Sequence, residues 1–196
     1  MKDDAIKCRV EAKEGGGTEI NTLDAWLQHG GPKEGEKQWH DFRSAKELAK
    51  AWLRHSSPKM PVEYAELLSR RSETRGFRPT LAIAEVSIAI DGFAGPRNSD
   101  MVVIGDAGQS RVVLAVEAKA DEQFAGTTDD ELRRVTNPDS NKPERIDNLS
   151  AAVLSKPVDD LVRSLRYQHL VALDTCHSST RGIRDYLSVV RRWNKS

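Results

Sequence analysis

The sequence has few of the residues and motifs that identify disulfide-bonded, metal–thiolate or membrane proteins. Its two cysteines, Cys8 and Cys176, lie near opposite ends of the 196-residue chain. Because this spacing fits neither a metal site nor a redox motif, and no secretory leader is recognisable, we expect reduced thiols in a cytoplasmic protein. The longest apolar run, Leu81–Ile90, is interrupted by Glu85, which argues against a membrane span. Nucleophile-elbow, phosphate-loop and HExxH motifs are absent as well.

A surplus of charge of either sign is also absent. Lysine plus arginine and aspartate plus glutamate both number 30, so the formal net charge is zero. Nucleic-acid-binding proteins usually show a basic excess, which this composition does not supply. The charge is nevertheless uneven, because residues 161–196 contain seven basic residues and two acidic ones. A basic C-terminal segment is therefore joined to a more acidic remainder.

The length and the 38% hydrophobic content predict one compact domain with a substantial core. Within it we expect an N-terminal helical extension over residues 1–78. This extension packs on an α/β core with a basic C-terminal segment over residues 79–196. A weak strand at Ile6–Ala12 and three short helices make up the extension. Ser44 and Glu47 have the spacing of a capping box, which predicts Ser44 as the N-cap of one of these helices.

The strongest local signal is a β-hairpin in the middle of the chain. Two runs rich in β-branched residues, Met101–Ile104 and Val112–Val116, are separated by a Gly-Asp-Ala-Gly turn. A hairpin brings the start of its first strand beside the end of its second, so Asp100 is expected near Glu117 and Lys119. Because side chains alternate across a strand, Glu117 and Lys119 leave the sheet on the same face.

Two carboxylates and an ammonium group are thereby expected at one end of a sheet. Paired hard oxygen ligands suit Mg²⁺ or Mn²⁺, which polarise a phosphoryl oxygen and lower the pKa of a bound water. Lys119 can orient that water or stabilise the charge that develops on a phosphate. Without a metal, Asp100 and Glu117 repel each other, so at least one should have a raised pKa. The alternative is a surface hairpin with a solvated salt bridge.

The pattern Asp100…Glu117-Ala118-Lys119 on two adjacent strands resembles the PD-(D/E)xK motif of the restriction-endonuclease-like nuclease superfamily. The resemblance covers residues 80–175. It implies an α/β fold with an αβββαβ core, in which helices flank a central mixed sheet. It also implies metal-dependent phosphodiester cleavage. Asp100, Glu117 and the Ala118 carbonyl would then hold Mg²⁺ or Mn²⁺, with Lys119 near the attacking water.

A second set of motifs is spread over a longer part of the chain. They are Gly30-Gly31-Pro32, Trp39-His40, the SAKELAKAW segment from Ser44, the VEAK strand ending at Lys119 and the Arg166-Tyr167-Gln168 triplet. This set resembles a family of uncharacterised bacterial proteins that are grouped with these nucleases, over roughly residues 30–170. The resemblance implies the same fold and a suspected nuclease site.

The segment Pro79–Ile90, which precedes the hairpin, is predicted to be a helix. Its apolar residues and Glu85 share one face at helical spacing, although the β-branched content leaves a strand as the alternative. The superfamily resemblance implies that Glu85 is an additional metal ligand. The competing interpretation is a buried glutamate paired with an arginine such as Arg78.

A helix is also expected over Pro157–Leu173, beyond the strand that carries the ExK motif. The resemblance implies that this helix brings Gln168 towards the phosphate. Arg163, Arg166 and Tyr167 form a basic surface with an aromatic ring, which suits contact with a nucleic-acid backbone. An amphipathic helix that covers the sheet, with its arginines in water, accounts for the same residues equally well.

Together these features predict a Mg²⁺- or Mn²⁺-dependent nuclease with nucleic acid as its partner, DNA favoured over RNA. No membrane partner is expected, and a homodimer is left open. The first alternative is a catalytically inactive protein that keeps the nuclease fold for binding or scaffolding, which the zero net charge favours. The second is a metal-dependent hydrolase of small phosphorylated substrates, which would need less basic surface.

Overall fold

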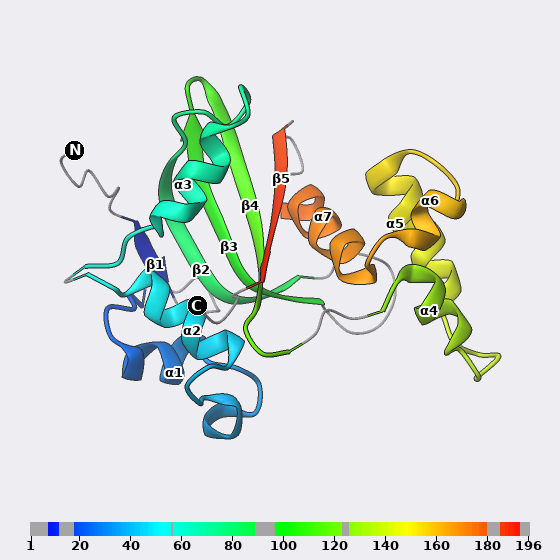
Figure 1. Cartoon of the computed structure of the whole chain (residues 1–196), viewed down its shortest axis with the longest axis horizontal. Coiled ribbons are helices and arrows are strands. Elements are labelled where there is room, and N and C mark those ends of the chain that lie inside the picture. The colour runs from blue at the N-terminus through cyan, green and yellow to red at the C-terminus, as the bar shows by residue number, and fades with distance from the viewer. Residues whose placement is uncertain are drawn as a thin grey trace.

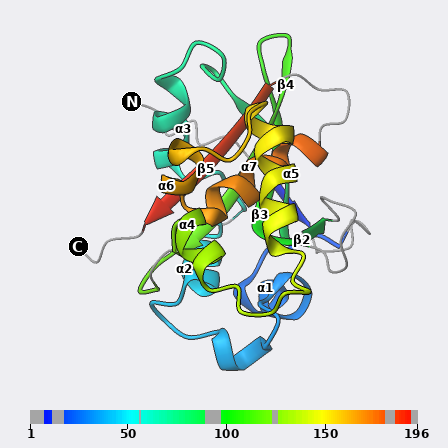
Figure 2. The same ribbon diagram turned by 90° about the vertical axis from the view of Figure 1, so that its right-hand side faces the viewer.

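A mixed, open β-sheet lies between two groups of helices (Figures 1 and 2). The computed structural model describes residues 8–11, 18–55, 57–88, 97–122, 126–179 and 185–192. The sheet has five strands in the order β1-β2-β3-β4-β5. They are β1 (Arg9–Glu11), β2 (Arg78–Ile88), β3 (Arg97–Ala107), β4 (Ser110–Lys119) and β5 (Asp185–Arg192). The α/β class with a mixed sheet is therefore as predicted.

The central part of the sheet is an antiparallel meander of β2, β3 and β4, and each edge strand is parallel to its neighbour. The predicted hairpin is confirmed as β3 and β4. Its strands extend further than expected, because pairing runs to Ala107–Ser110 and leaves Gly108 and Gln109 as the turn. Gly108 has a φ of +62°, a left-handed conformation that glycine adopts without steric cost.

The helix predicted over Pro79–Ile90 is wrong within the described residues, because residues 78–88 form the strand β2. This strand pairs with β1 on one side and β3 on the other. Ala82 and Ala84 are fully buried beneath helices, as expected for a strand inside a sheet that is covered by other elements. A short buried apolar run has no periodicity that separates the two structures, and its β-branched residues favour the strand. Residues 89 and 90 lie outside the described set.

The helices α1 (Leu23–Gly30), α2 (Ser44–Trp52) and α3 (Val62–Ser69) cover one face of the sheet (Figure 1). Their anchors in the main core are the large, fully buried side chains of Trp26, Trp52 and Tyr64. The short 3₁₀ helix η1 (Gly35–Gln38) lies in the connection between α1 and α2. This core packs against alternate residues of the strands, including Met101 and Leu114.

The capping box predicted at the start of α2 is wrong. Arg43 is the N-cap, and Ser44 is already the first helical residue. Glu47 accepts a hydrogen bond from the backbone N–H of Phe42, at 2.9 Å, rather than from Ser44. The Ser44 hydroxyl instead bonds to residues that follow β4, so it connects the helix start to the end of that strand.

The other face carries α7 (Tyr167–Ser179), which packs on β4 and links it to β5. Outside α7 lie α4 (Thr128–Arg133), α5 (Lys142–Leu154) and α6 (Asp160–Ser164) (Figure 2). The single helix predicted over residues 157–173 is therefore wrong. The chain is extended at Leu165, whose carbonyl accepts a hydrogen bond from Thr128 N–H at 2.8 Å, and α7 begins two residues later.

Cys8 is a buried free cysteine. Burial raises the pKa of its thiol to about 12, so it stays protonated and unreactive near neutral pH. The side chain of Cys176 lies outside the described set. In the described part of the chain, no helix combines the length and the apolar composition needed to cross a membrane.

Gly105 of β3 lies so close to β2 that a side chain does not fit. A Cβ at this position would overlap the carbonyl oxygen of Arg78 and lie 2.6 Å from the ring of Phe77. We predict that Gly105→Ala lowers the free energy of unfolding by about 1–3 kcal/mol, measured by denaturant unfolding. The exposed turn substitution Gln109→Ala should change it by less than about 0.5 kcal/mol. Equal stabilities of the two variants would contradict this packing.

Candidate active site

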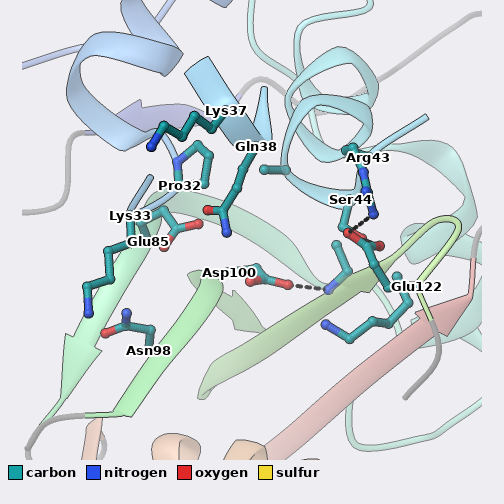
Figure 3. A pocket seen from close by; sticks show the side chains of 13 residues that line it. Pro32, Lys33, Lys37, Gln38, Arg43, Ser44, Glu85, Asn98, Asp100 and Glu122 are labelled. Atoms are coloured by element: carbon teal, nitrogen blue, oxygen red, sulfur yellow. Dashed lines mark hydrogen bonds and ion pairs between the residues drawn. The ribbon is translucent and has the colours of Figure 1, made fainter. Parts of the chain in front are cut away.

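The candidate site lies where β3 and β4 separate. Their pairing ends at Met101–Val116, beyond which β3 continues beside β2 and β4 continues beside β5. Asp100 and Glu117 are the next residues along the two strands. The backbone N–H of Ala118 donates to Asp100 Oδ2 at 2.6 Å (Figure 3). The carboxylate thus takes the place of the backbone carbonyl that would accept this hydrogen bond if β3 and β4 were still paired. The expected juxtaposition of Asp100 with the ExK strand is therefore present.

Asp100, Glu117 and Lys119 belong to the same face of the sheet. Met101 and Val116 are buried in the core under α1–α3, so their neighbours Asp100 and Glu117 belong to the face that carries α7. Glu117 Oε1 accepts two hydrogen bonds, from Lys119 Nζ at 2.8 Å and from Gln168 Nε2 at 3.0 Å. Gln168 comes from the first turn of α7. The structure thus brings together four of the side chains that the sequence singled out.

The electrostatics of the site centre on Asp100. Burial raises the pKa of its carboxyl to about 8, with added repulsion from Glu117 and Glu85, against the opposing effects of Lys119 and the Ala118 N–H. The expectation of one raised carboxyl pKa is confirmed for Asp100. Burial alone would lower the pKa of Lys119, but the charges of Glu117 and Asp100 outweigh it and raise that pKa. Lys119 is therefore a charged ammonium group at neutral pH.

Glu85 lies on β2 between the pairs Ala84–Met101 and Val86–Ser99, directly across from Asp100. Its backbone has a φ of +51°, a left-handed conformation that costs a residue with a side chain roughly 1–3 kcal/mol. The competing prediction of a Glu85–Arg78 ion pair is wrong, because Arg78 lies at the other end of β2, opposite Asp106. Seven residues of strand separate the two by roughly 23 Å.

A cleft of about 460 Å³ opens beside these acids. Figure 3 shows Asp100 in its middle, with Lys33, Lys37 and Gln38 to one side and Arg43 to the other. These four residues come from the connection between α1 and α2, which was not predicted to contribute to the site. The charged residues around a Gly-Gly-Pro turn give no local pattern that points to the hairpin, since the contact depends on tertiary packing.

The same connection is fixed to the end of β4. The Ser44 hydroxyl donates to Glu122 and accepts from Ala120 N–H at 3.1 Å. Arg43 lies 3.5 Å from Asp121 and 3.8 Å from Glu122. Burial raises the pKa of the Glu122 carboxyl, but the hydrogen bond from Ser44 and the backbone donors outweigh burial and lower it. Glu122 therefore remains ionised and holds this wall of the cleft in place.

The proposed nucleic-acid contacts on α6 and α7 lie outside the cleft lining. Arg163 forms an ion pair with Asp129, at 3.0 Å. Arg166 is exposed and pairs through its backbone with Thr127. Tyr167, the first residue of α7, is partly buried against the smaller core formed by α5, α6 and α7.

The donor set suits a small, hard cation that keeps part of its water shell. Within the described ranges, no group of three or more His, Cys, Asp or Glu side chains is arranged to hold a metal ion. Asp100 and Glu117 each use only one oxygen in hydrogen bonds to the described residues. Mg²⁺ is commonly held by one or two carboxylates together with waters, so the two free oxygens fit this chemistry.

Comparison with known proteins places the chain in a family without assigning it an activity. A family model described as Domain of unknown function (DUF6946) matches residues 19–177, which include every cleft residue named above. The chain therefore belongs to the DUF6946 family. None of the curated proteins and none of the solved structures gives a significant match.

The raised pKa of Asp100 predicts how stability changes with pH in the metal-free protein. The unfolded chain loses this proton near pH 3.8, whereas the folded protein keeps it up to about pH 8. Ionisation in this interval occurs only in the unfolded chain and favours unfolding increasingly as the pH rises, by about 1.4 kcal/mol per pH unit. Asp100→Asn, which stays neutral, should gain stability relative to wild type as the pH rises from about 5 to about 8.

Thermal unfolding in EDTA at both pH values measures this difference. The control Asp139→Asn removes an exposed acid from a loop and should show no such trend. A stability difference between Asp100→Asn and wild type that stays constant with pH would show that Asp100 is ionised in both states.

Proposed function

We propose that this DUF6946 protein is a metal-dependent phosphodiesterase that cleaves nucleic acid, with DNA favoured over RNA. The observation that carries the proposal is the convergence of Asp100, Glu117 and Lys119 at the point where two strands separate beside a cleft. Two carboxylates next to an ammonium group suit a phosphate-bound cation and its attacking water. A surface salt bridge would require neither the partial burial nor the third acid, Glu85.

The order of elements supports a restriction-endonuclease-like core. An antiparallel meander, β2-β3-β4, follows the helices α2 and α3, and α7 then leads to β5, parallel to β4. The resemblance of the Asp100…Glu117-Ala118-Lys119 pattern to the PD-(D/E)xK motif implies this αβββαβ arrangement. Asp100 and Glu117 lie on β3 and β4, the two adjacent strands that the motif requires.

Each residue then has a distinct role. Asp100 and Glu117 would hold Mg²⁺ or Mn²⁺ together with the Ala118 carbonyl, while Glu85 would add negative charge beside Asp100. When bound, the ion would polarise a phosphoryl oxygen and acidify a water. Lys119, held by Glu117 at 2.8 Å, would orient that water and stabilise charge on the phosphate. Gln168 donates to the same Glu117 oxygen and so fixes the direction of this carboxylate.

A catalytically inactive nuclease-fold protein that binds or scaffolds is the alternative. Two observations favour it. The chain has no net charge, and Arg163, one of the expected backbone contacts, is already paired with Asp129. This alternative retains the acids as part of the fold and assigns no reaction to them.

We predict that purified protein with Mg²⁺ or Mn²⁺ cleaves nucleic acid and that EDTA stops the cleavage. Lys119→Ala should reduce the rate by about 10²–10³-fold while leaving metal affinity nearly unchanged, because lysine is not a ligand. Asp100→Asn should weaken metal binding itself, because one ligand charge is lost. Cleavage of labelled single- and double-stranded DNA and RNA measures the rates, and calorimetry measures metal binding.

The matched control is Lys142→Ala. Lys142 also forms an ion pair with a glutamate, Glu131, at 2.7 Å, but it lies on α5 and does not line the cleft. Its cleavage rate should equal that of wild type. An inactive wild-type protein on all four substrates with both metals would favour the scaffolding alternative, as would equal activities of the Lys119 and Lys142 variants.

A further inference from the structure

We propose that residues 33–43, between α1 and α2, form a binding wall for single-stranded nucleic acid, in which Lys33 and Lys37 contact phosphates and Phe42 stacks on a base. The inference rests on the proposed function and names the substrate class and the residues that bind it. It assigns binding to the N-terminal part of the chain and cleavage to the sheet. The cleft between them has the volume of a small-ligand pocket, about 460 Å³, which suits a single strand better than a duplex.

Lys33 and Lys37 provide positive charge that the described residues leave without an ion pair. Both are exposed, both line the cleft, and neither forms an ion pair with the described residues. Nearby cations differ in this respect, since Lys46 and Lys50 both bind Asp41, at 3.0 and 2.8 Å. Two exposed ammonium groups without an ion pair can bind an anionic ligand in the cleft. A phosphodiester backbone has the required charge and repeat.

Phe42 would favour a single strand over a duplex, because its ring can stack only on a base that is unpaired. Its side chain is 62% exposed, and it directly precedes Arg43, which lines the cleft. Its φ of +70° is strained for a bulky residue, and the backbone is held there by the hydrogen bond from its N–H to Glu47. Phe42 thus combines a strained backbone conformation with a largely exposed side chain next to a cleft-lining residue. Exposed aromatic rings stack on unpaired bases.

The two sides of the cleft then have different functions, binding on one side and cleavage on the other. Lys33 and Lys37 line one side of the cleft and Asp100 lies on the sheet (Figure 3), where Asp100 and Lys119 are held by hydrogen bonds to Ala118 and Glu117. A strand that lies along the wall presents one phosphate to the sheet and its neighbours to Lys33 and Lys37. The bonds of Ser44 to Glu122 and Ala120 keep the wall at a constant distance from the end of β4.

The test is binding of a fluorescent oligothymidylate of about 12 nucleotides. Fluorescence anisotropy is measured in EDTA over a series of salt concentrations, so no metal-dependent cleavage occurs. The double variant Lys33→Ala/Lys37→Ala should bind more weakly and reduce the slope of log K against log salt by about 1.4. Phe42→Ala should weaken binding by roughly 5- to 100-fold with an unchanged salt slope, whereas Phe42→Tyr should bind as wild type does.

A second Phe42 variant separates binding from folding. Phe42→Gly removes the ring but tolerates the left-handed backbone, so its thermal midpoint should equal or exceed that of wild type while its affinity falls as for Phe42→Ala. The controls are Val62→Ala, which shortens another exposed apolar side chain, and Lys142→Ala. Both should bind as wild type does.

The proposal is overturned if wild type does not bind the oligonucleotide, if the wall variants bind it normally, or if a duplex of the same length binds equally well. These outcomes are distinct from a failure of the proposed cleavage. Binding that depends on residues 33–43, without cleavage on addition of Mg²⁺, would support their role in binding and reject nuclease activity. Cleavage that the wall variants leave unchanged would support nuclease activity and reject the binding role of residues 33–43.

Discussion

Repulsion between acids that the fold holds together is the constraint on which the site depends. Asp100 and Glu117 lie where β3 and β4 separate, and Glu85 approaches Asp100 from β2. Removing these carboxylates from water disfavours their charges, and their proximity disfavours them further, which is why the pKa of Asp100 rises to about 8. A bound cation would turn the repulsion into attraction.

Several hydrogen bonds hold that cluster of acids in place. The Ala118 N–H stabilises Asp100 at the point where the ladder ends, and Lys119 neutralises Glu117 from the same strand. Gln168 reaches Glu117 from α7, so the helix that connects β4 to β5 also orients the acid. Ser44 ties the start of α2 to the residues after β4. Elements on both faces of the sheet, α2 and α7, therefore hold the end of β4 in place.

The parts of this arrangement that are local in sequence could be predicted from it. A hairpin fixes which residues lie opposite each other, so the grouping of Asp100 with Glu117 and Lys119 followed from spacing alone. The strand β2 was mistaken for a helix, because a short buried apolar run carries no periodicity that separates the two. The cleft wall at residues 33–43 was missed, because its approach to the sheet depends on the packing of α1 and α2. No spacing in the sequence encodes that contact.

The most direct test of the account counts the protons released when a metal binds. Calorimetric titration of the metal-free protein with Mn²⁺ at about pH 7, in buffers of different ionisation enthalpy, gives this number. With a pKa of about 8, Asp100 is mostly protonated at that pH and must ionise to become a ligand. The account therefore predicts release of nearly one proton per bound ion by wild type and almost none by Asp100→Asn. Binding without proton release, or no binding by wild type, would contradict it.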